Sequence, residues 1–129
     1  MTRIDVRVTS KGPLFDGRAQ AQVRAFQDAA EAEIAKRTLA VVRTRLAGAM
    51  KRPTGHYLSM VQITDTQVDD LAVTDNGVIY GPWLEGTSSR NRSTRFKGYA
   101  AFRRARQEIE GQAAKIGERA LPPYLRRMQ

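Results

Sequence analysis

The residues best suited to a chemical task are basic side chains in the last third of the chain. They are Arg90, Arg92, Arg95, Lys97, Arg103, Arg104 and Arg106. No acidic residue interrupts them before Glu108. Arginine pairs through two parallel hydrogen bonds with either a phosphate or a carboxylate. The pattern therefore predicts contact with DNA or with an acidic protein surface.

Two aromatic residues, Phe96 and Tyr99, lie among these basic side chains. Against a nucleic acid, aromatic rings stack on bases, and each neutralised phosphate adds about 0.9 to the slope of log affinity against log salt concentration. Against a protein, the same arginines would order on an acidic neighbour. Both alternatives stay open, and so does a solvated loop without a partner.

Carboxylates that converge would suggest two-metal phosphoryl transfer, and the candidates are Asp65, Asp69, Asp70 and Asp75. Asp69 and Asp70 are adjacent in a predicted strand, so their side chains point to opposite faces. Asp65 and Asp75 fall in predicted turns, where aspartate forms local hydrogen bonds. We therefore expect no carboxylate site.

Other catalytic groups and metal ligands are isolated in the sequence. The chain has no cysteine and a single histidine, His56, which excludes thiolate catalysis, cysteine zinc sites and a histidine cluster within one chain. Ser88 and Ser89 have no base that the sequence places beside them, and no glycine-rich run has the spacing of a P-loop. We expect no enzymatic activity and no cofactor.

Length and composition favour an ordinary globular protein. The chain has 129 residues, of which 41% are hydrophobic and 27% are charged, and we expect a single domain over residues 1–129. No apolar run reaches about 18 residues, and the first ten residues lack the apolar stretch of a secretory signal. We therefore expect a cytoplasmic protein without membrane contact. Its net charge of +9 favours an acidic partner.

A long helix is predicted over residues 18–50, which contain no proline and no glycine before Gly48. Its apolar residues are Val23, Phe26, Ala30, Ile34, Leu39, Val42, Leu46 and Met50. Both halves of this series keep helical spacing, but five residues separate Ile34 from Leu39. We therefore expect the two halves to bury different faces, or the helix to bend.

The length of this helix predicts an overhang. At about 1.5 Å per residue it would span roughly 50 Å, whereas a compact chain of this size has a diameter of about 36 Å. An amphipathic helix that extends beyond its domain exposes an apolar stripe, which a neighbouring copy usually covers. The alternative is a kinked helix that folds back.

Strands are predicted on both sides of the long helix. Residues 3–9 alternate apolar and polar side chains, which is typical of a strand with one buried face. Three more strands are predicted at residues 57–64, 68–74 and 78–84. Asn76 and Gly77 favour a tight hairpin between the last two strands, because both residues tolerate a positive φ. We expect an antiparallel meander that the first strand joins at an edge.

The residue composition changes after these strands. Residues 86–95 carry no apolar side chain, which predicts a mobile basic loop over residues 86–97. Apolar residues at helical spacing then predict a helix over residues 98–120, which Pro122 ends. We expect residues 121–129 to form a short turn or to order against a partner.

Aromatic residues near the third predicted strand of this group suggest an interface. Tyr80 and Trp83 bracket Pro82, and a proline that withholds a ladder hydrogen bond favours an edge strand. Large aromatic side chains at an exposed edge are common interface anchors. Trp83 either serves in this way or is buried in the domain's own core.

The order of the elements and several short motifs resemble the neck or tail-completion proteins of siphophages, the lambdoid head-to-tail joining family. The resemblance covers roughly residues 18–120. It rests on Pro53-Thr54-Gly55 followed by Leu58-Ser59, and on Tyr80 followed by Glu85-Gly86-Thr87. A polar loop and a last amphipathic helix complete the pattern.

The resemblance implies a structural virion protein that is assembled in the host cytoplasm and forms an oligomeric ring around the DNA channel. Expected partners are further copies, connector, tail-terminator or tail-tube proteins, and DNA in the channel. We expect the subunit interface at Tyr80, Trp83, Glu85 and Phe96. Because tight phosphate binding would resist the passage of DNA, this role favours docking of the basic loop on an acidic neighbouring subunit.

Two other functions stay open. One is a stand-alone nucleic-acid-binding protein that uses the basic residues from Arg90 to Arg106. The other is a small ribonuclease without a metal, in which arginine and tyrosine stabilise the scissile phosphate. All three share one predicted fold of the α+β class, with a three- or four-stranded antiparallel sheet packed against a long N-terminal helix and a C-terminal helix.

Overall fold

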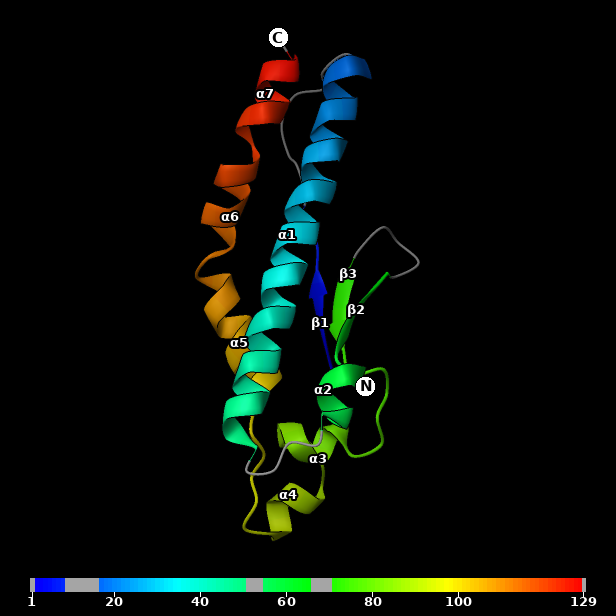
Figure 1. The fold of residues 1–129 in the computed structure, drawn as a ribbon, viewed down its shortest axis with the longest axis vertical. Helices are drawn as coiled ribbons and strands as arrows, with labels where there is room; N and C mark the ends of the chain where they lie inside the picture. The colour runs from blue at the N-terminus through cyan, green and yellow to red at the C-terminus, as the bar shows by residue number, and fades with distance from the viewer. Residues whose placement is uncertain (1, 9–16, 51–54, 66–70, 129) are drawn as a thin grey trace.

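The computed structural model describes residues 2–8, 17–50, 55–65 and 71–128. The strands are β1 (Arg3–Val6), β2 (Gln62–Asp65) and β3 (Leu71–Thr74). The helices are α1 (Gly17–Ala49), α2 (His56–Met60), α3 (Gly81–Glu85), α4 (Arg90–Ser93), α5 (Ala101–Glu110), α6 (Ala113–Ala120) and α7 (Pro122–Met128). Helix α1 lies between the sheet and the three C-terminal helices (Figure 1). The predicted α+β fold is confirmed.

The sheet is antiparallel with the order β1-β3-β2, so the first strand joins at an edge as expected. Ile4, Val73 and Ile63 lie side by side across the three strands. Ile4 and Val73 are buried and belong to the core cluster that contains Val42 of α1. Strand β1 ends at Val6, before the predicted boundary, and Thr9 falls outside the described residues.

The predicted strand at residues 57–64 is only half right. Its first residues form α2, and the strand begins at Gln62. Gly55 has a φ of 84°, and its carbonyl accepts the N–H of Ser59 at 2.9 Å. A helical turn brings Tyr57 and Val61, four residues apart, close together in the same core cluster, whereas a strand would hold them about 13 Å apart along one face. The start of the predicted strand at residues 68–74 falls outside the described residues, and β3 covers Leu71–Thr74.

The predicted strand at residues 78–84 is wrong. Asn76 and Gly77 do adopt positive φ values of 58° and 73°, but the chain then continues into α3 and does not return as a strand. Pro82 lies in the first turn of α3, where its missing N–H costs nothing. Gly81 packs against the buried Asp75, and a Cβ at Gly81 would overlap its carboxylate.

Helix α1 is one continuous element, and the kinked alternative is not observed (Figure 1). Five of its buried positions recur every four residues, at Ala30, Ile34, Thr38, Val42 and Leu46, and Glu31 and Ala35 are buried beside them. Thr38 fills the apparent gap in the apolar series, because its hydroxyl donates to the Ile34 carbonyl at 2.7 Å. Each step of four residues rotates the position by about 40°, so the buried face winds gradually around the helix.

This winding serves two core clusters, so the expectation of two buried faces is confirmed. Val42 and Leu46 join the cluster with Tyr57, Val61 and Phe102. Ile34 and Ala35 join a second cluster, whose other buried members are Val6, Ile109 and Ile116.

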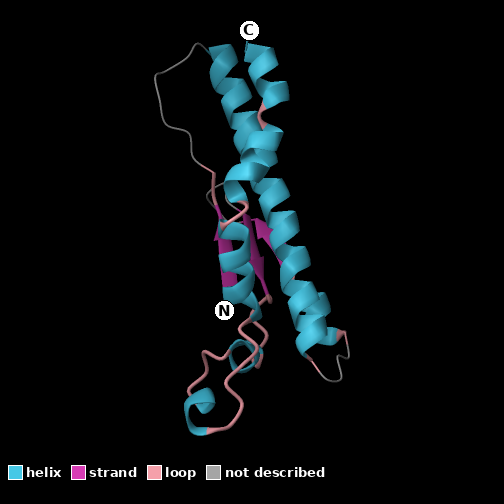
Figure 2. Ribbon diagram, turned by 90° about the vertical axis from the view of Figure 1, so that its left-hand side faces the viewer, coloured by secondary structure: helices cyan, strands magenta, loops and turns pink. Residues whose placement is uncertain are grey.

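The N-terminal half of α1 extends beyond the sheet, as its length predicts. Both ribbon views show α7 running beside this part of the helix (Figures 1 and 2). The rings of Phe26 and Tyr124 meet edge to face with their centroids 6.1 Å apart. Residues 122–128, expected as a short turn, therefore form a helix that covers one side of the overhang.

The helix predicted over residues 98–120 is divided into α5 and α6. Helix α5 begins at Ala101, after two residues with positive φ, Gly98 and Ala100. Gly111 and Gln112 interrupt the helix, and the N–H of Gln112 bonds to the Ile109 carbonyl at 2.9 Å in a tight turn. The predicted apolar face is confirmed, since Phe102, Ile109 and Ile116 are buried.

Candidate functional site

Residues 86–97, expected as a mobile loop, contain α4 and a closed set of hydrogen bonds. We refer to residues 86–98 as the arginine module. It projects from the end of the molecule beyond α3, opposite to the end where the chain terminates (Figure 1). The backbone that carries the basic side chains of the module therefore has a defined structure.

A single buried side chain, Asn91, organises the arginine module. Its Oδ1 accepts the N–H of Ser88 at 3.0 Å, and its Nδ2 donates to the carbonyls of Trp83 at 3.2 Å and Phe96 at 3.0 Å. Asn91 is only 3% exposed. One amide thus ties together three separate points of the backbone. Sequence reasoning missed this role, because an asparagine in a polar run is typical of a solvated loop.

Two glycines close the base of the module. Gly86 and Gly98 have φ values of 101° and 93°, and their backbones are in direct contact. Beside them the N–H of Tyr99 bonds to the Leu84 carbonyl at 2.6 Å, and the N–H of Ala100 bonds to the Glu85 carbonyl at 3.2 Å. The two ends of the module are therefore held together.

Glu85 forms hydrogen bonds within the chain. Its two carboxylate oxygens accept the N–H groups of Phe102 at 2.9 Å and Arg103 at 3.0 Å. These groups lie in the first turn of α5, where backbone donors lack partners and a negative charge is favourable. Glu85, expected at the subunit interface, thus caps α5 from a different helix.

The expected interface aromatics have different surroundings. Phe96 packs between Trp83 and Tyr99, with ring centroids 5.0 Å from each, and all three are half-buried. Tyr80 packs on Tyr57 at 5.7 Å and is 43% exposed. The rings of Phe96 and Tyr99, which would stack on bases in a nucleic-acid complex, are thus partly occupied by contacts within the chain.

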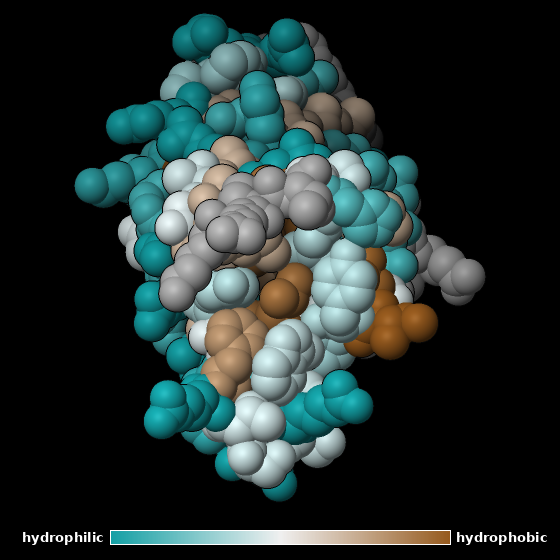
Figure 3. Space-filling model, turned by 60° about the horizontal axis from the view of Figure 1, so that its bottom comes forward, coloured by the Kyte–Doolittle hydropathy of each residue, from teal (hydrophilic) through white to brown (hydrophobic). Residues whose placement is uncertain are grey.

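Exposed apolar surface also lies at this end of the molecule. Figure 3 shows apolar and aromatic side chains around a hollow, with hydrophilic side chains at the edge of the view. Ile79, next to Tyr80, is 96% exposed. An almost fully exposed isoleucine beside a half-exposed tyrosine favours a contact with another molecule.

The seven basic residues of the predicted patch divide into groups. Arg90, Arg92, Arg95 and Arg104 are exposed, and their side chains contact no carboxylate in the described part of the chain. Lys97 is partly occupied, because its Nζ donates to the carbonyls of Asn91 at 2.8 Å and Arg92 at 3.3 Å. Arg106 pairs with Glu110 at 3.0 Å, and Arg103 lines a hollow described below.

The aspartates do not meet in the described residues. Asp75 is fully buried, where it accepts the Tyr57 hydroxyl at 3.0 Å and the N–H of Gly77 at 3.0 Å. Asp65 is exposed at the end of β2, while Asp69 and Asp70 fall outside the described residues. Among the described side chains, no group of three or more histidine and acidic residues is arranged to hold a metal ion.

His56, Ser88 and Ser89 were considered as catalytic groups, and the structure places them at the starts of short helices. His56 is exposed at the start of α2. Ser88 Oγ accepts the N–H of Arg90 at 3.3 Å within the arginine module, and Ser89 precedes α4. None of these contacts brings a base to a serine hydroxyl.

The Tyr57–Asp75 pair makes the free energy of unfolding depend on pH in the alkaline range. Burial, followed by the neighbouring Asp75 carboxylate, raises the pKa of Tyr57 above its ordinary value of about 10. The unfolded chain therefore loses this proton at a lower pH than the folded chain. We expect the free energy of unfolding to be fully retained below about pH 10 and to fall as the pH rises further.

Urea unfolding followed by circular dichroism at pH 8 and pH 10.5 measures this effect, with Tyr57→Phe as the comparison. The variant should be less stable at pH 8 by about 1–2 kcal/mol, because the buried Asp75 oxygen loses a donor. It should also lose less stability than the parent between the two pH values. An equal loss in both proteins would show that Tyr57 does not cause the pH dependence.

Comparison with known proteins gave no match. No protein-family model, curated protein or solved structure matches this chain. Within the described ranges, no helix has the length and apolar character needed to cross a membrane.

Proposed function

We propose that the chain is a structural protein of the bacteriophage neck. In this proposal several copies form a ring that joins the head connector to the tail around the DNA channel, in a virion assembled in the host cytoplasm. The neighbouring connector, tail-terminator or tail-tube proteins are its partners, and it carries out no catalysis. The proposal rests on the motifs that resemble this family and on the shape of the molecule.

The observation that carries the proposal is the exposed apolar surface at the end of the molecule that carries the arginine module. There Ile79 is 96% exposed, and the neighbouring Tyr80 is 43% exposed. Exposed apolar residues that lie together favour a contact with another molecule, and in an oligomer a neighbouring copy makes this contact.

The family-like motif has a clear structural use in this chain. In Glu85-Gly86-Thr87, Glu85 caps α5, Gly86 closes the base of the arginine module, and the N–H of Thr87 bonds to the Pro82 carbonyl at 2.9 Å. The motif thus fixes how the module projects from the body. This supports a role for the module as a docking element at one end of each subunit.

The alternative function is stand-alone binding of nucleic acid through the surface from Arg90 to Arg106. It is favoured by the exposed arginines of the module, which have no carboxylate partner among the described residues. The packing of Phe96 between Trp83 and Tyr99 favours it less, because these rings already contact one another.

Size-exclusion chromatography with light scattering, followed by negative-stain electron microscopy, tests the proposal. We expect a mass that is a multiple of 14.4 kDa at micromolar concentration, and ring-shaped particles. Replacing the exposed Ile79 with aspartate should shift the distribution toward single copies if the exposed apolar end contributes to assembly. A strict monomer whose affinity for duplex DNA falls steeply with salt would support the alternative.

A further inference from the structure

A basic hollow lies between β1, α3 and α5. Its volume is about 330 Å³. Three arginines line it, namely Arg3, Arg103 and Arg106. Apolar atoms of Ile4, Pro82 and Phe102 complete part of the wall. The hollow therefore combines three cationic groups with an apolar wall.

Glu85, the acidic residue in the wall of this hollow, forms no ion pair with the three arginines. Both oxygens of Glu85 accept backbone N–H groups at the start of α5. Arg103 forms no side-chain hydrogen bond or ion pair with any residue that the structure describes. Its guanidinium is thus available to a ligand.

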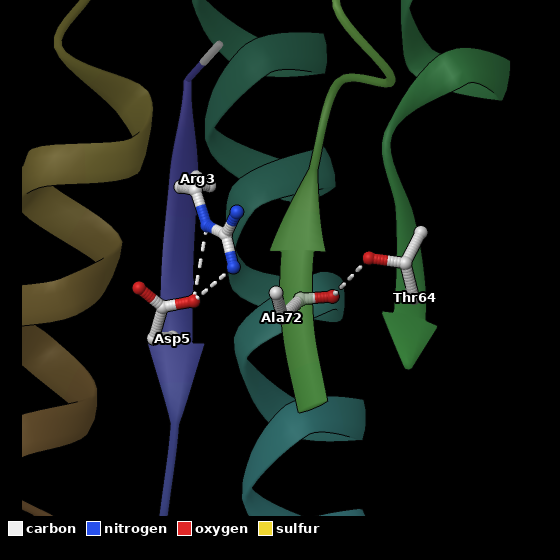
Figure 4. Close-up of polar contacts among 4 residues, drawn as sticks. All are labelled: Arg3, Asp5, Thr64 and Ala72. Carbon is white, nitrogen blue, oxygen red and sulfur yellow. Dashed lines mark hydrogen bonds and ion pairs between the residues drawn. The ribbon is translucent and has the colours of Figure 1, made fainter. Parts of the chain in front are cut away.

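The other two arginines keep donors available as well. Arg3 contacts Asp5 through Nε, at 3.0 Å, and through Nη2, and both contacts end on the same oxygen of Asp5 (Figure 4). Arg106 uses Nε for its ion pair with Glu110, at 3.0 Å. Both pairs are exposed to solvent, so they are weak and leave Nη groups for another acceptor.

We infer that this hollow binds glutamate side chains of an acidic segment in a neighbouring protein. A glutamate offers a carboxylate for the guanidinium groups and an aliphatic stem for the apolar wall. A duplex phosphate carries no aliphatic stem, so it would leave the apolar wall of Ile4, Pro82 and Phe102 without a partner. The chemistry of the hollow therefore favours a protein over DNA.

A second copy of this chain is a poor source of that segment. No two of its glutamates are adjacent in the sequence, so it offers no continuous acidic segment of its own. The chain also carries 22 basic against 13 acidic residues, so it offers a neighbour more positive than negative charge. The occupant is expected to be a different, acidic protein, which deepens the proposed function and rests on it.

The test uses a fluorescein-labelled peptide of six glutamates, with a six-glutamine peptide as the control ligand. Fluorescence anisotropy is measured for the full chain and for two variants, Arg103→Gln and Arg104→Gln. The variants have the same change of charge at adjacent positions of α5, but only Arg103 lines the hollow. Circular dichroism verifies that both variants fold.

We expect the glutamate peptide to bind more tightly than the glutamine peptide. Arg103→Gln should weaken that binding about tenfold, and Arg104→Gln by less than about threefold. Equal losses in the two variants, or equal binding of the two peptides, would overturn the inference. Duplex DNA that displaces the peptide and loses the same affinity on Arg103→Gln would also overturn it, in favour of phosphate as the ligand.

This result can be separated from the test of the ring. Peptide binding is read on each chain whatever its oligomeric state, whereas light scattering reads the assembly. Ring formation without peptide binding would reject only the basic hollow as a docking site. Peptide binding by a strict monomer would reject the ring and keep the acidic partner.

Discussion

Replacing Gly98 with alanine is expected to destabilise the protein by more than about 3 kcal/mol. Gly98 has a φ of 93°, which strains any residue with a Cβ atom. A Cβ at this position would also overlap the backbone of Gly86 and lie 2.6 Å from the Glu85 carbonyl carbon. The backbone atoms cannot yield without opening the base of the arginine module. Thermal and urea unfolding of the parent and the variant measure the loss.

The control is the same substitution at Gly117 in α6. Apart from its chain neighbours and the backbone of its own helix, no atom in the described part of the chain would lie within 4 Å of a Cβ at Gly117, and the residue is inside a helix. Alanine should therefore stabilise the protein by about 0.5–1 kcal/mol, because glycine is a poor helix former. The two changes are chemically identical and should have opposite signs. A Gly98→Ala variant as stable as the parent would mean that Gly86 and Gly98 are not in contact.

Replacing Leu46 with alanine should cost about 2–5 kcal/mol. Leu46 is 2% exposed and belongs to the larger core cluster, where α1 meets Tyr57 and Phe102. Deleting its side chain removes buried apolar area and leaves a cavity that the rigid helix can only partly fill. The free energy of unfolding in urea, with the slope unchanged, measures this effect.

Leu125→Ala is the matched control for that core substitution. Leu125 is 47% exposed in α7, so the same truncation should cost less than about 1 kcal/mol. Similar losses at the two positions would contradict the assignment of Leu46 to the core. A large loss at Leu125 alone would show that α7 contributes more to stability than its exposure indicates.

The elements predicted most accurately are those whose side chains repeat with a clear period. The apolar series from Val23 to Met50, in a stretch without proline and without glycine before Gly48, predicts α1 within one residue of each end. The alternation around Ile4 and Val6 predicts β1 as an edge strand. In both cases the period follows from local backbone geometry, so no knowledge of distant residues is needed.

The predictions that failed concern short segments with two possible local structures. Residues 57–60 and 81–85 contain apolar and aromatic side chains that suit either a strand or a helical turn. Gly55 and Pro82 favour the start of a helix, but the contacts of Tyr57 with Asp75 and of Gly81 with the same carboxylate select it. These contacts join residues that are 6 to 18 positions apart, so a local pattern cannot predict them.

The basic cluster itself is readable from the order of residues, because charge and spacing are properties of the chain. Which of these basic side chains are exposed, which are hydrogen-bonded and which line the hollow cannot be predicted from the sequence. Arg90 is exposed because Asn91 is turned inward to three backbone groups, and Arg103 reaches a hollow because Glu85 holds the start of α5. Composition and period thus determine the long helix, the edge strand and the excess of positive charge. Long-range hydrogen bonds, and the close contact of Gly86 with Gly98, decide which of those charges remain available to a partner.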